Sequence, residues 1–388
     1  MTTSEYKKYF QNKISVHCIM LYIEHVTWIC SIVILVMCIM YMSYDTCDEY
    51  FMEHFGSDCG DFLGEPVVYR GSERPGVIFV SVASYRDDEC SITIRSIFEK
   101  AGDPSNIVVG VCEQNRNPEE SCVKGSIHSK YHKQIRIKSM DYKEAKGPTY
   151  ARYHVSTLWE GEEYYLQIDS HTSFEKNWDL DLIHMFKQCK KYSDRPILTV
   201  YPPTADQMKG KGAPEMCFGR LSNDKIPIFL AGWDRTLTDD GEPKRSPKPF
   251  IAAGFMFLQG KFVNEVPFDP RLPHLFQGEE TLLSARLWTS GYDFFTPNRK
   301  VCSHHYTREG KPKYWDDHKD HTKCRVQSEK RILFLLGLGD KPSDSEEFFR
   351  QNHRYGFGRV RKLADYWKEA GIDFTKKGKE AISNKCTK

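Results

Sequence analysis

The sequence predicts an α/β protein in which helices flank a mostly parallel central sheet. A transmembrane helix is predicted to precede this α/β domain. Short aliphatic runs, typical of strands buried on both faces, alternate with segments whose apolar residues recur at helical spacing. The first such unit runs strand, loop, helix, strand over residues 77–111, and a βαβ unit of this kind makes its strands parallel. An uncharged apolar run at 26–42 predicts the membrane helix.

This apolar run is long enough to cross a bilayer core. Lysines precede it and acidic residues follow it, so the positive-inside rule predicts a single-pass type II protein with a cytosolic tail at 1–25, an anchor at 26–44 and the large domain across the membrane. A cleaved signal peptide fits less well, because no small-residue cleavage site follows the run. The alternative is a buried core helix, although such helices seldom lack a polar face altogether.

Chain length, net charge and cysteine content further narrow the class of protein. A chain of 388 residues has room for one large α/β domain or two ordinary ones, and its net charge of +2 gives no reason to expect a nucleic-acid partner. Of the 13 cysteines, most fall beyond the apolar run, where an oxidising compartment would allow disulfides. Cys47/Cys59 and Cys112/Cys122 are close enough in sequence to pair. Zinc-module spacing is absent from the sequence, so a structural metal is not expected.

The remaining elements follow in order along the chain. Residues 45–75 are acidic and contain glycine and cysteine, which is typical of a stem or linker. Strands are expected at 77–82, 107–111, 164–168, 196–201, 250–258 and 293–296, and helices at 90–101, 150–159, 281–289 and 360–370. Residues 206–249 show little periodicity and many Gly and Pro residues, which predicts a long surface excursion.

Asp169 and His171 directly follow the expected strand at 164–168. Ligands of open α/β sheets bind beyond the carboxyl ends of strands, and residues two apart face the same way in an extended chain. One oxygen and one nitrogen ligand suit a manganese-like ion, which can bridge a nucleotide diphosphate and neutralise the charge of the leaving group. The alternative is a local cap in which Asp169 and Ser170 start the next turn.

Two later segments offer further polar groups. Glu279 and Glu280 follow a glycine at the start of an expected helix, where the helix dipole favours carboxylates and where a carboxylate is well presented. His304 and His305 follow the expected strand at 293–296, and one of them could complete the metal site. The other would point to the opposite side, because adjacent residues of an extended chain alternate.

Long literal motifs carry a family resemblance. They are SVASYRDDEC at 81–90, VGVCEQN at 109–115, GPTYAR at 147–152, LWEGEEYYLQIDSHTSFEKNWD at 158–179, FIAAGFMF at 250–257, VPFDPRLPHLFQGEETLLSARLWTSGYDFFTP at 266–297, HHYTR at 304–308 and RYGFGRVRKLADYW at 354–367. In this order they resemble the polypeptide α-N-acetylglucosaminyltransferases, and more distantly the polypeptide N-acetylgalactosaminyltransferases, which share the Asp-x-His strand end.

This resemblance implies a GT-A-type catalytic domain at 76–375, followed by a tail at 376–388. It implies retaining transfer of N-acetylglucosamine from UDP-GlcNAc to a Ser, Thr or hydroxyproline hydroxyl of a polypeptide. The implied cofactor is Mn²⁺ or another divalent ion such as Mg²⁺, and the implied location is the Golgi lumen or another part of the secretory pathway. The rival hypotheses are another UDP-sugar or a non-protein acceptor, a non-catalytic lectin-like relative, and a phosphohydrolase of nucleotide sugars.

The resemblance also implies a role for individual residues. The donor nucleotide would be held by Ser84, Tyr85, Arg86, Glu113, Arg152 and Ser170, with Arg152 facing the diphosphate, where a guanidinium suits phosphate oxygens. Gly254, Glu279 and Glu280 would border the donor sugar, and Trp233 would lie on the acceptor side. Asp169 and His171 would bind the metal with His304, on a His-x-Tyr-x-Arg pattern, or with His305, as the distant relatives favour. In the alternative without a donor-binding role, Arg86 pairs with Asp87 in a turn and Arg152 is an exposed helix residue.

Overall fold

The computed structural model describes residues 68–209, 214–222, 225–232, 241–319, 321–339 and 352–383. All of them belong to one compact unit that spans residues 62–388. The predicted anchor at 26–44, the pair Cys47/Cys59 and Trp233 lie outside the described residues. Within the described ranges, none of the helices combines the length and apolar character needed to cross a membrane.

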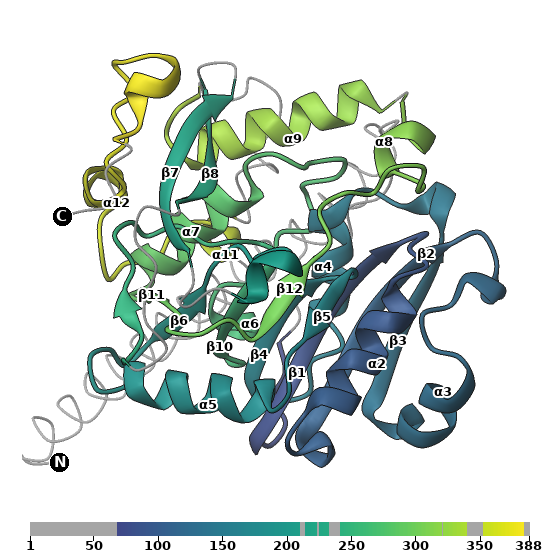
Figure 1. Cartoon of the computed structure of the whole chain (residues 1–388). Coiled ribbons are helices and arrows are strands. Elements are labelled where there is room, and N and C mark those ends of the chain that lie inside the picture. The colour runs from purple at the N-terminus through teal and green to yellow at the C-terminus, as the bar shows by residue number, and fades with distance from the viewer. Residues whose placement is uncertain are drawn as a thin grey trace, which may run out of the picture. The chain divides into compact units, whose positions relative to one another are not determined.

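An eight-stranded sheet forms the centre of this unit, in the order β3-β2-β1-β4-β10-β6-β11-β9 (Figure 1). The strands are β1 (Arg74–Tyr85), β2 (Ile107–Asn115), β3 (Ile135–Asp141), β4 (Glu162–Asp169), β6 (Pro196–Thr199), β9 (Lys244–Arg245), β10 (Phe255–Gln259) and β11 (Asp293–Thr296). Only β10 and β9 run antiparallel to their neighbours within this sheet. The prediction of a mixed α/β protein with a mostly parallel sheet is confirmed.

Helices cover both faces of the sheet (Figure 1), as the unbroken apolar strands require. Alternate residues of β1 face opposite ways, so that Ile78 and Val80 pack on one side and Phe79 on the other. The helices on the first side are α2 (Cys90–Lys100), α3 (Gly125–Tyr131) and α5 (Trp178–Cys189). Those on the second are α4 (Pro148–Ser156), α6 (Phe262–Glu265) and α7 (Glu279–Thr289).

The prediction of a long surface excursion at 206–249 is wrong for part of that range. Residues there form an antiparallel hairpin of β7 (Glu215–Ser222) and β8 (Ile226–Gly232). Met216 and Phe229 of this hairpin are buried in a third apolar cluster with α7, α9 (Thr322–Leu335) and α12 (Leu363–Ala370). The hairpin was missed because its apolar residues do not alternate regularly with polar ones, which is the pattern that predicts a half-buried strand.

One disulfide joins Cys90 to Cys122, whereas Cys112 is a free, buried thiol. The sequence-based pairing of Cys112 with Cys122 is therefore wrong. Cys112 lies in β2 and faces the α4 side of the sheet, while Cys90 and Cys122 pack together on the α2 side. Closeness along the chain could not show this separation by the sheet.

A short antiparallel ribbon lies beside the carboxyl end of β4. It consists of β5 (Thr172–Phe174) and β12 (Cys302–His304), and it places His304 opposite Thr172. Two small helices, α8 (Tyr314–Asp317) and α11 (Asn352–Tyr355), follow in the C-terminal part. The ribbon brings the two predicted metal-binding segments together, although they are more than a hundred residues apart in the sequence.

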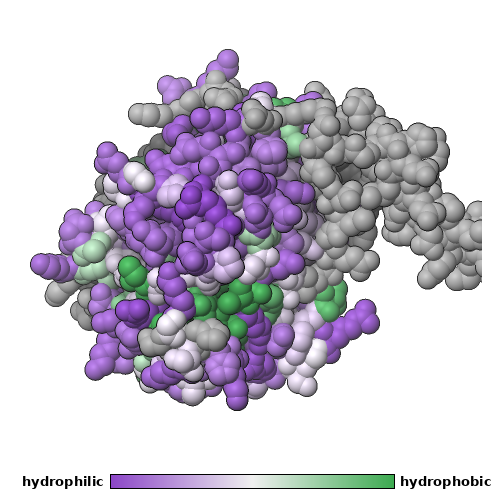
Figure 2. All heavy atoms as spheres, turned by 90° about the vertical axis from the view of Figure 1, so that its right-hand side faces the viewer, coloured by the Kyte–Doolittle hydropathy of each residue, from purple (hydrophilic) through white to green (hydrophobic). Residues whose placement is uncertain are grey.

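The outermost strand at one end of the sheet, β3, lies at the right of Figure 1. Its residues 137–139 are exposed. Figure 2, which looks at this side of the molecule, shows a mainly hydrophilic surface with apolar atoms gathered in one band. Lys138 on the strand is of the charged type that discourages pairing of a sheet edge with another chain.

Candidate functional site

Asp169 is the last residue of β4, and both of its carboxylate oxygens have partners. Arg152 of α4 donates from Nη2 to Oδ1 at 2.9 Å, and Nε2 of His304 lies 3.1 Å from Oδ2. Burial by itself would raise the pKa of Asp169, but the contact with His304 and the charge of Arg152 outweigh it and hold that pKa well below its usual range. Asp169 is therefore an ionised carboxylate next to a ring nitrogen.

His171 completes a group of three candidate metal-binding residues. Single ligand atoms of Asp169, His171 and His304 all lie within 4.8 Å of one another, and the two imidazole rings are 4.6 Å apart between centroids. His171 uses Nδ1 for a 2.8 Å contact with Asp87, which leaves Nε2 for a ligand. One carboxylate oxygen and two imidazole nitrogens suit Mn²⁺ and similar divalent ions. The chain thus contains the predicted candidate metal site, and its donor set fits the predicted cofactor.

The two neighbouring histidines have different surroundings. His304 is buried, because β12 pairs with β5 and turns its side chain toward Asp169. His305 is exposed, and its Nδ1 lies 2.8 Å from a carboxylate oxygen of Glu89. The structure therefore groups His304, and not His305, with Asp169 and His171.

Arg152 is buried and joins two carboxylates across the site. Its Nη1 donates to Glu279, the first residue of α7, and its Nη2 donates to Asp169, as described above. The resemblance places Arg152 on the diphosphate, but in this structure its remaining donor, Nε, is buried without a hydrogen-bond partner. Burial raises the pKa of Glu279 even though the Arg152 charge opposes that shift. Arg152 thus orients Asp169 and Glu279 and balances their charge.

Glu280 binds the backbone of the loop that contains Ala253 and Gly254. Its Oε1 accepts from the Ala253 backbone N–H at 2.8 Å, and its Oε2 accepts from the Tyr201 hydroxyl at 2.5 Å. Burial raises the pKa of Glu280 to about 7, although these two hydrogen bonds lower it. Gly254, the next residue in this loop, therefore has a fixed position against the metal site.

Gly254 lies against the side chain of Asp169. A Cβ at Gly254 would stand 2.8 Å from Asp169 Oδ2, the oxygen that faces His304. The sequence predicted close backbone approach inside a strand at 250–258. The close approach is present, but it is to a side chain, and β10 begins only at Phe255.

We expect Gly254→Ala to weaken Mn²⁺ binding by roughly 10- to 100-fold, the range found when the support of a metal ligand is disturbed. The added methyl group would push the Asp169 carboxylate away from His304. Titration with Mn²⁺ followed by electron paramagnetic resonance measures the change. Gly102→Ala is the control, since its Cβ would meet the exposed Leu180 side chain and Asn177 Oδ1, and neither residue is a metal ligand. Unchanged Mn²⁺ affinity in Gly254→Ala would show that the carboxylate moves aside without consequence.

The predicted nucleotide-binding turn follows β1. Arg86 has a left-handed backbone conformation, with φ of 46°, which is uncommon outside glycine and is often found at functional sites. Its Nη1 contacts Asp317 of α8 at 2.5 Å, and the Tyr85 hydroxyl donates to the same oxygen at 2.7 Å. The guanidinium also lies 4.9 Å from the ring centroid of Tyr142. Arg86 thus pairs with Asp317, and the alternative prediction that it pairs with Asp87 is wrong.

Three other predicted donor residues point into the protein. Ser84 is fully buried within the sheet. Glu113 is also buried, and its Oε1 accepts from the Cys122 backbone N–H at 2.7 Å and from the Ser121 hydroxyl at 2.9 Å. Ser170 is buried and donates from Oγ to Asp87 at 2.6 Å. In this structure these side chains hold the frame of the site together.

Two residues beside the metal site were not assigned a role from the sequence. Asp87 is buried and contacts both Ser170 and His171; although burial opposes it, these contacts and the charge of Arg308 keep the pKa of Asp87 below its ordinary value. Arg308 lies 3.4 Å from Asp87 through Nη2, and its Nε and Nη2 are buried without hydrogen-bond partners. The signal for Asp87 is its place after β1, the strand next to β4, but strand order is not visible in the sequence.

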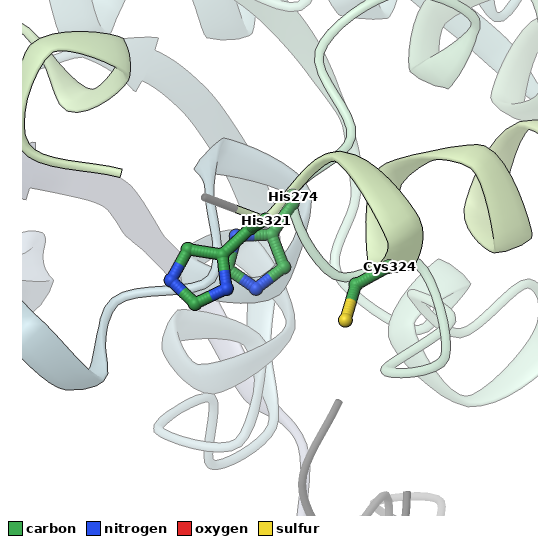
Figure 3. Close-up of side chains that lie close together, drawn as sticks. All are labelled: His274, His321 and Cys324. Carbon is green, nitrogen blue, oxygen red and sulfur yellow. The ribbon is translucent and has the colours of Figure 1, made fainter. Parts of the chain in front are cut away.

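A second group of metal-binding residue types, His274, His321 and Cys324, lies near the start of α9 (Figure 3). The two imidazole rings stack face to face, with centroids 4.1 Å apart. Cys324 is disulfide-bonded and so offers no thiolate. His274 uses Nδ1 to contact the Tyr314 hydroxyl, and burial lowers its pKa to about 3. These contacts pack α8 against the core, and we assign no metal to this group.

Comparison with solved structures shows the same fold in a glycosyltransferase. GalNAc-T7 with UDP, GalNAc and Mn²⁺ has a TM-score of 0.51 and 14% identity over 74% of this chain and 56% of its own, so the chain spans little more than half the length of that protein. S. aureus TarS 1-349 with UDP-GlcNAc has a TM-score of 0.42 and 13% identity, covering 76% of this chain and 80% of its own. Mannosyltransferase PcManGT from Pyrobaculum calidifontis with GDP-Man and Mn²⁺ has a TM-score of 0.42 and 11% identity, covering 85% of this chain and 79% of its own. None of the curated proteins matches this chain.

The family model described as Glycosyltransferase (GlcNAc) matches residues 77–131 and 124–376. These ranges take in the sheet, apart from the start of β1 at 74–76, and every residue of the candidate metal site. The chain therefore belongs to the GlcNAc glycosyltransferase family.

Proposed function

We propose that this protein is a retaining, metal-dependent glycosyltransferase that moves N-acetylglucosamine from UDP-GlcNAc to a serine, threonine or hydroxyproline hydroxyl of a polypeptide. The observation that carries the proposal is the convergence of Asp169, His171 and His304 at the end of β4. GalNAc-T7, which has the same fold, was solved with UDP, GalNAc and Mn²⁺. The family match supports the sugar, and the motif resemblance supports the polypeptide acceptor.

The residues around this site suggest how the chain would handle the donor. A bound divalent ion would supply positive charge against the departing diphosphate. Arg308 has buried Nε and Nη2 groups without hydrogen-bond partners, and Nη2 lies 3.4 Å from Asp87, the residue that contacts His171. A guanidinium of this kind suits phosphate oxygens. We therefore assign the diphosphate contact to Arg308, with Arg152 holding Asp169 and Glu279 in place.

The same geometry favours a front-face reaction. Retaining glycosidases use a carboxylate nucleophile, but Asp169 and Glu279 are both bound by Arg152 here. The acceptor hydroxyl would attack the anomeric carbon on the side from which the diphosphate leaves. As the new C–O bond forms and the sugar–phosphate bond breaks, the proton of the hydroxyl passes to the leaving phosphate.

The proposal is tested with the purified full chain in detergent, UDP-GlcNAc, Mn²⁺ and a Thr/Pro-rich peptide. We expect the peptide to gain the mass of one N-acetylhexosamine, with an α linkage by proton NMR coupling. Transfer only from another UDP-sugar, or only to a non-protein acceptor, would replace the donor or acceptor assignment. Release of free sugar that does not depend on an acceptor would indicate a phosphohydrolase, and binding without turnover a lectin-like relative.

Arg308→Ala should weaken UDP binding by roughly 10- to 100-fold, because a charge-assisted contact to phosphate contributes about 1.5–3 kcal/mol. Binding of uridine, which has no phosphate, should stay unchanged. Isothermal titration calorimetry with both ligands in the presence of Mn²⁺ separates the two effects. Arg299→Ala, which removes a partly exposed arginine paired with Asp181, is the control. An equal loss of uridine and UDP affinity would contradict the phosphate assignment.

We also propose a type II membrane topology with the catalytic domain in the Golgi lumen. The apolar run at 26–42 and the charges on either side of it support this orientation. The disulfide between Cys90 and Cys122 is of the kind that persists in an oxidising compartment. Protease added to sealed microsomes should spare the domain; its digestion without detergent would refute the orientation.

A further inference from the structure

We infer that Asp87 is a positioning residue of the metal centre, which fixes His171 in the tautomer that presents Nε2 to the ion. This inference rests on the proposed metal-dependent function and concerns how the chain prepares its own ligand. Asp87 follows β1, and in the sheet β1 lies next to β4, with Ala83 opposite Asp169. Adjacent parallel strands therefore bring the Asp87 turn to the same edge as the metal ligands.

The contacts of Asp87 are directed at the ligand segment. Its side chain is completely buried. One oxygen, Oδ2, accepts from the Ser170 hydroxyl at 2.6 Å and lies 2.8 Å from His171 Nδ1. The other oxygen, Oδ1, lies 3.4 Å from Arg308 Nη2 and accepts from the Glu89 backbone N–H at 3.1 Å. One carboxylate thus contacts the turn after β1, the metal-binding turn after β4 and the segment that follows His304.

The chemistry of this contact selects one tautomer. An ionised carboxylate can only accept hydrogen bonds, so the proton of a neutral His171 must be on Nδ1. The lone pair is then on Nε2, the nitrogen that remains for the ion. A carboxylate behind a metal-binding histidine orients the ring and makes its nitrogen more basic. Without this partner the neutral ring would distribute its proton over both nitrogens.

The backbone of the same turn is held independently of Asp87. Thr93 of α2 donates from Oγ1 to the Ser170 carbonyl at 2.7 Å and accepts from the Thr172 N–H at 3.0 Å. A change at Asp87 is therefore expected to alter the His171 ring before it alters the turn. This separation makes a positioning role distinguishable from a structural one.

The test is Asp87→Asn, with Mn²⁺ alone as the probe and the full chain in detergent. The amide can accept from a protonated Nδ1 or donate to a bare one, so it no longer fixes the tautomer. We expect the Mn²⁺ dissociation constant, measured by electron paramagnetic resonance, to rise by roughly 10- to 100-fold. Asp88→Asn is the matched control, because the neighbouring Asp88 is exposed and pairs with Lys311 on the surface.

A double-variant cycle shows whether Asp87 acts through His171. In a His171→Ala background, Asp87→Asn should cause no further loss of Mn²⁺ affinity. Wild-type Mn²⁺ affinity in Asp87→Asn, or an equal additional loss in the His171→Ala background, would overturn the inference. If wild-type protein itself fails to bind Mn²⁺, the proposed function fails instead, so the two failures are distinguishable.

A measurement on the wild-type chain covers the case in which Asp87→Asn does not fold. Nitrogen-15 NMR of the metal-free protein labelled at histidine reports which ring nitrogen carries the proton, and the His171→Ala variant assigns the signal. We expect neutral His171 to be protonated at Nδ1. Protonation at Nε2 would overturn the inference without any substitution at Asp87.

Discussion

Replacing Asp169 by alanine is expected to abolish sugar transfer, with a loss of at least about 10³-fold in kcat/KM, because metal stabilisation of a developing charge contributes several kcal/mol. Asp169 supplies the only carboxylate oxygen among the three grouped ligands. Its removal would also take away one of the two carboxylates that balance Arg152, which would make the site beside the two imidazoles less favourable for a cation. Both the oxygen ligand and the local negative charge would be lost together.

The measurement is transfer rate against Mn²⁺ concentration for the variant and the wild type. Asp181→Ala is the control, because Asp181 lies on α5 in a partly exposed pair with Arg299 and should leave the rate unchanged. Circular dichroism confirms that both variants are folded. Near wild-type turnover of Asp169→Ala with only trace metal would refute the assignment of Asp169 as a ligand.

The part of this site that the sequence predicts is the part governed by local rules. Asp169 and His171 follow a strongly apolar strand, and the position of ligands at strand ends is general. The choice between His304 and His305 required the three-dimensional structure, because the alternation of side chains along an extended chain shows only that one of them faces the site. The pairing of β12 with β5 decides it, and that register is a tertiary contact between residues 172 and 304.

Glu113 and Asp87 show which part of the site could not be predicted from the sequence. Glu113 lies near the carboxyl end of β2 and Asp87 follows β1, so strand-end reasoning treats them alike. The loop closed by the Cys90–Cys122 disulfide turns Ser121 and the Cys122 N–H onto Glu113, which occupies that carboxylate. Asp87 instead faces His171 because β1 lies next to β4. Neither the disulfide nor the strand order can be obtained from apolar patterning.

Replacing Arg152 by methionine is expected to lower the free energy of unfolding by about 3–5 kcal/mol, the usual cost of removing one partner of a buried ion pair. Arg152 and Glu279 have side chains only 7% and 6% exposed, so water cannot compensate the carboxylate that remains. Asp169 would lose its contact with the guanidinium as well, so transfer should also fall. Urea unfolding followed by circular dichroism measures the stability change.

The loss in Arg152→Met should depend on pH in a defined direction. Burial already raises the pKa of Glu279, and without the Arg152 charge that pKa would rise further. A carboxyl group with a raised pKa in the folded state favours folding while it is protonated, and this contribution disappears as the pH rises through the folded-state pKa. The stability difference from wild type should therefore grow from mildly acidic to mildly alkaline pH.

Glu279→Gln added to Arg152→Met should recover part of the stability and remove the pH dependence, because no buried charge is then left at position 279. Arg299→Met, at a partly exposed pair, should change stability by about 1 kcal/mol or less. A pH-independent loss in Arg152→Met that Glu279→Gln does not relieve would show that Arg152 stabilises the domain by packing. The ion pair joining α4, β4 and α7 would then not be what positions the metal ligand.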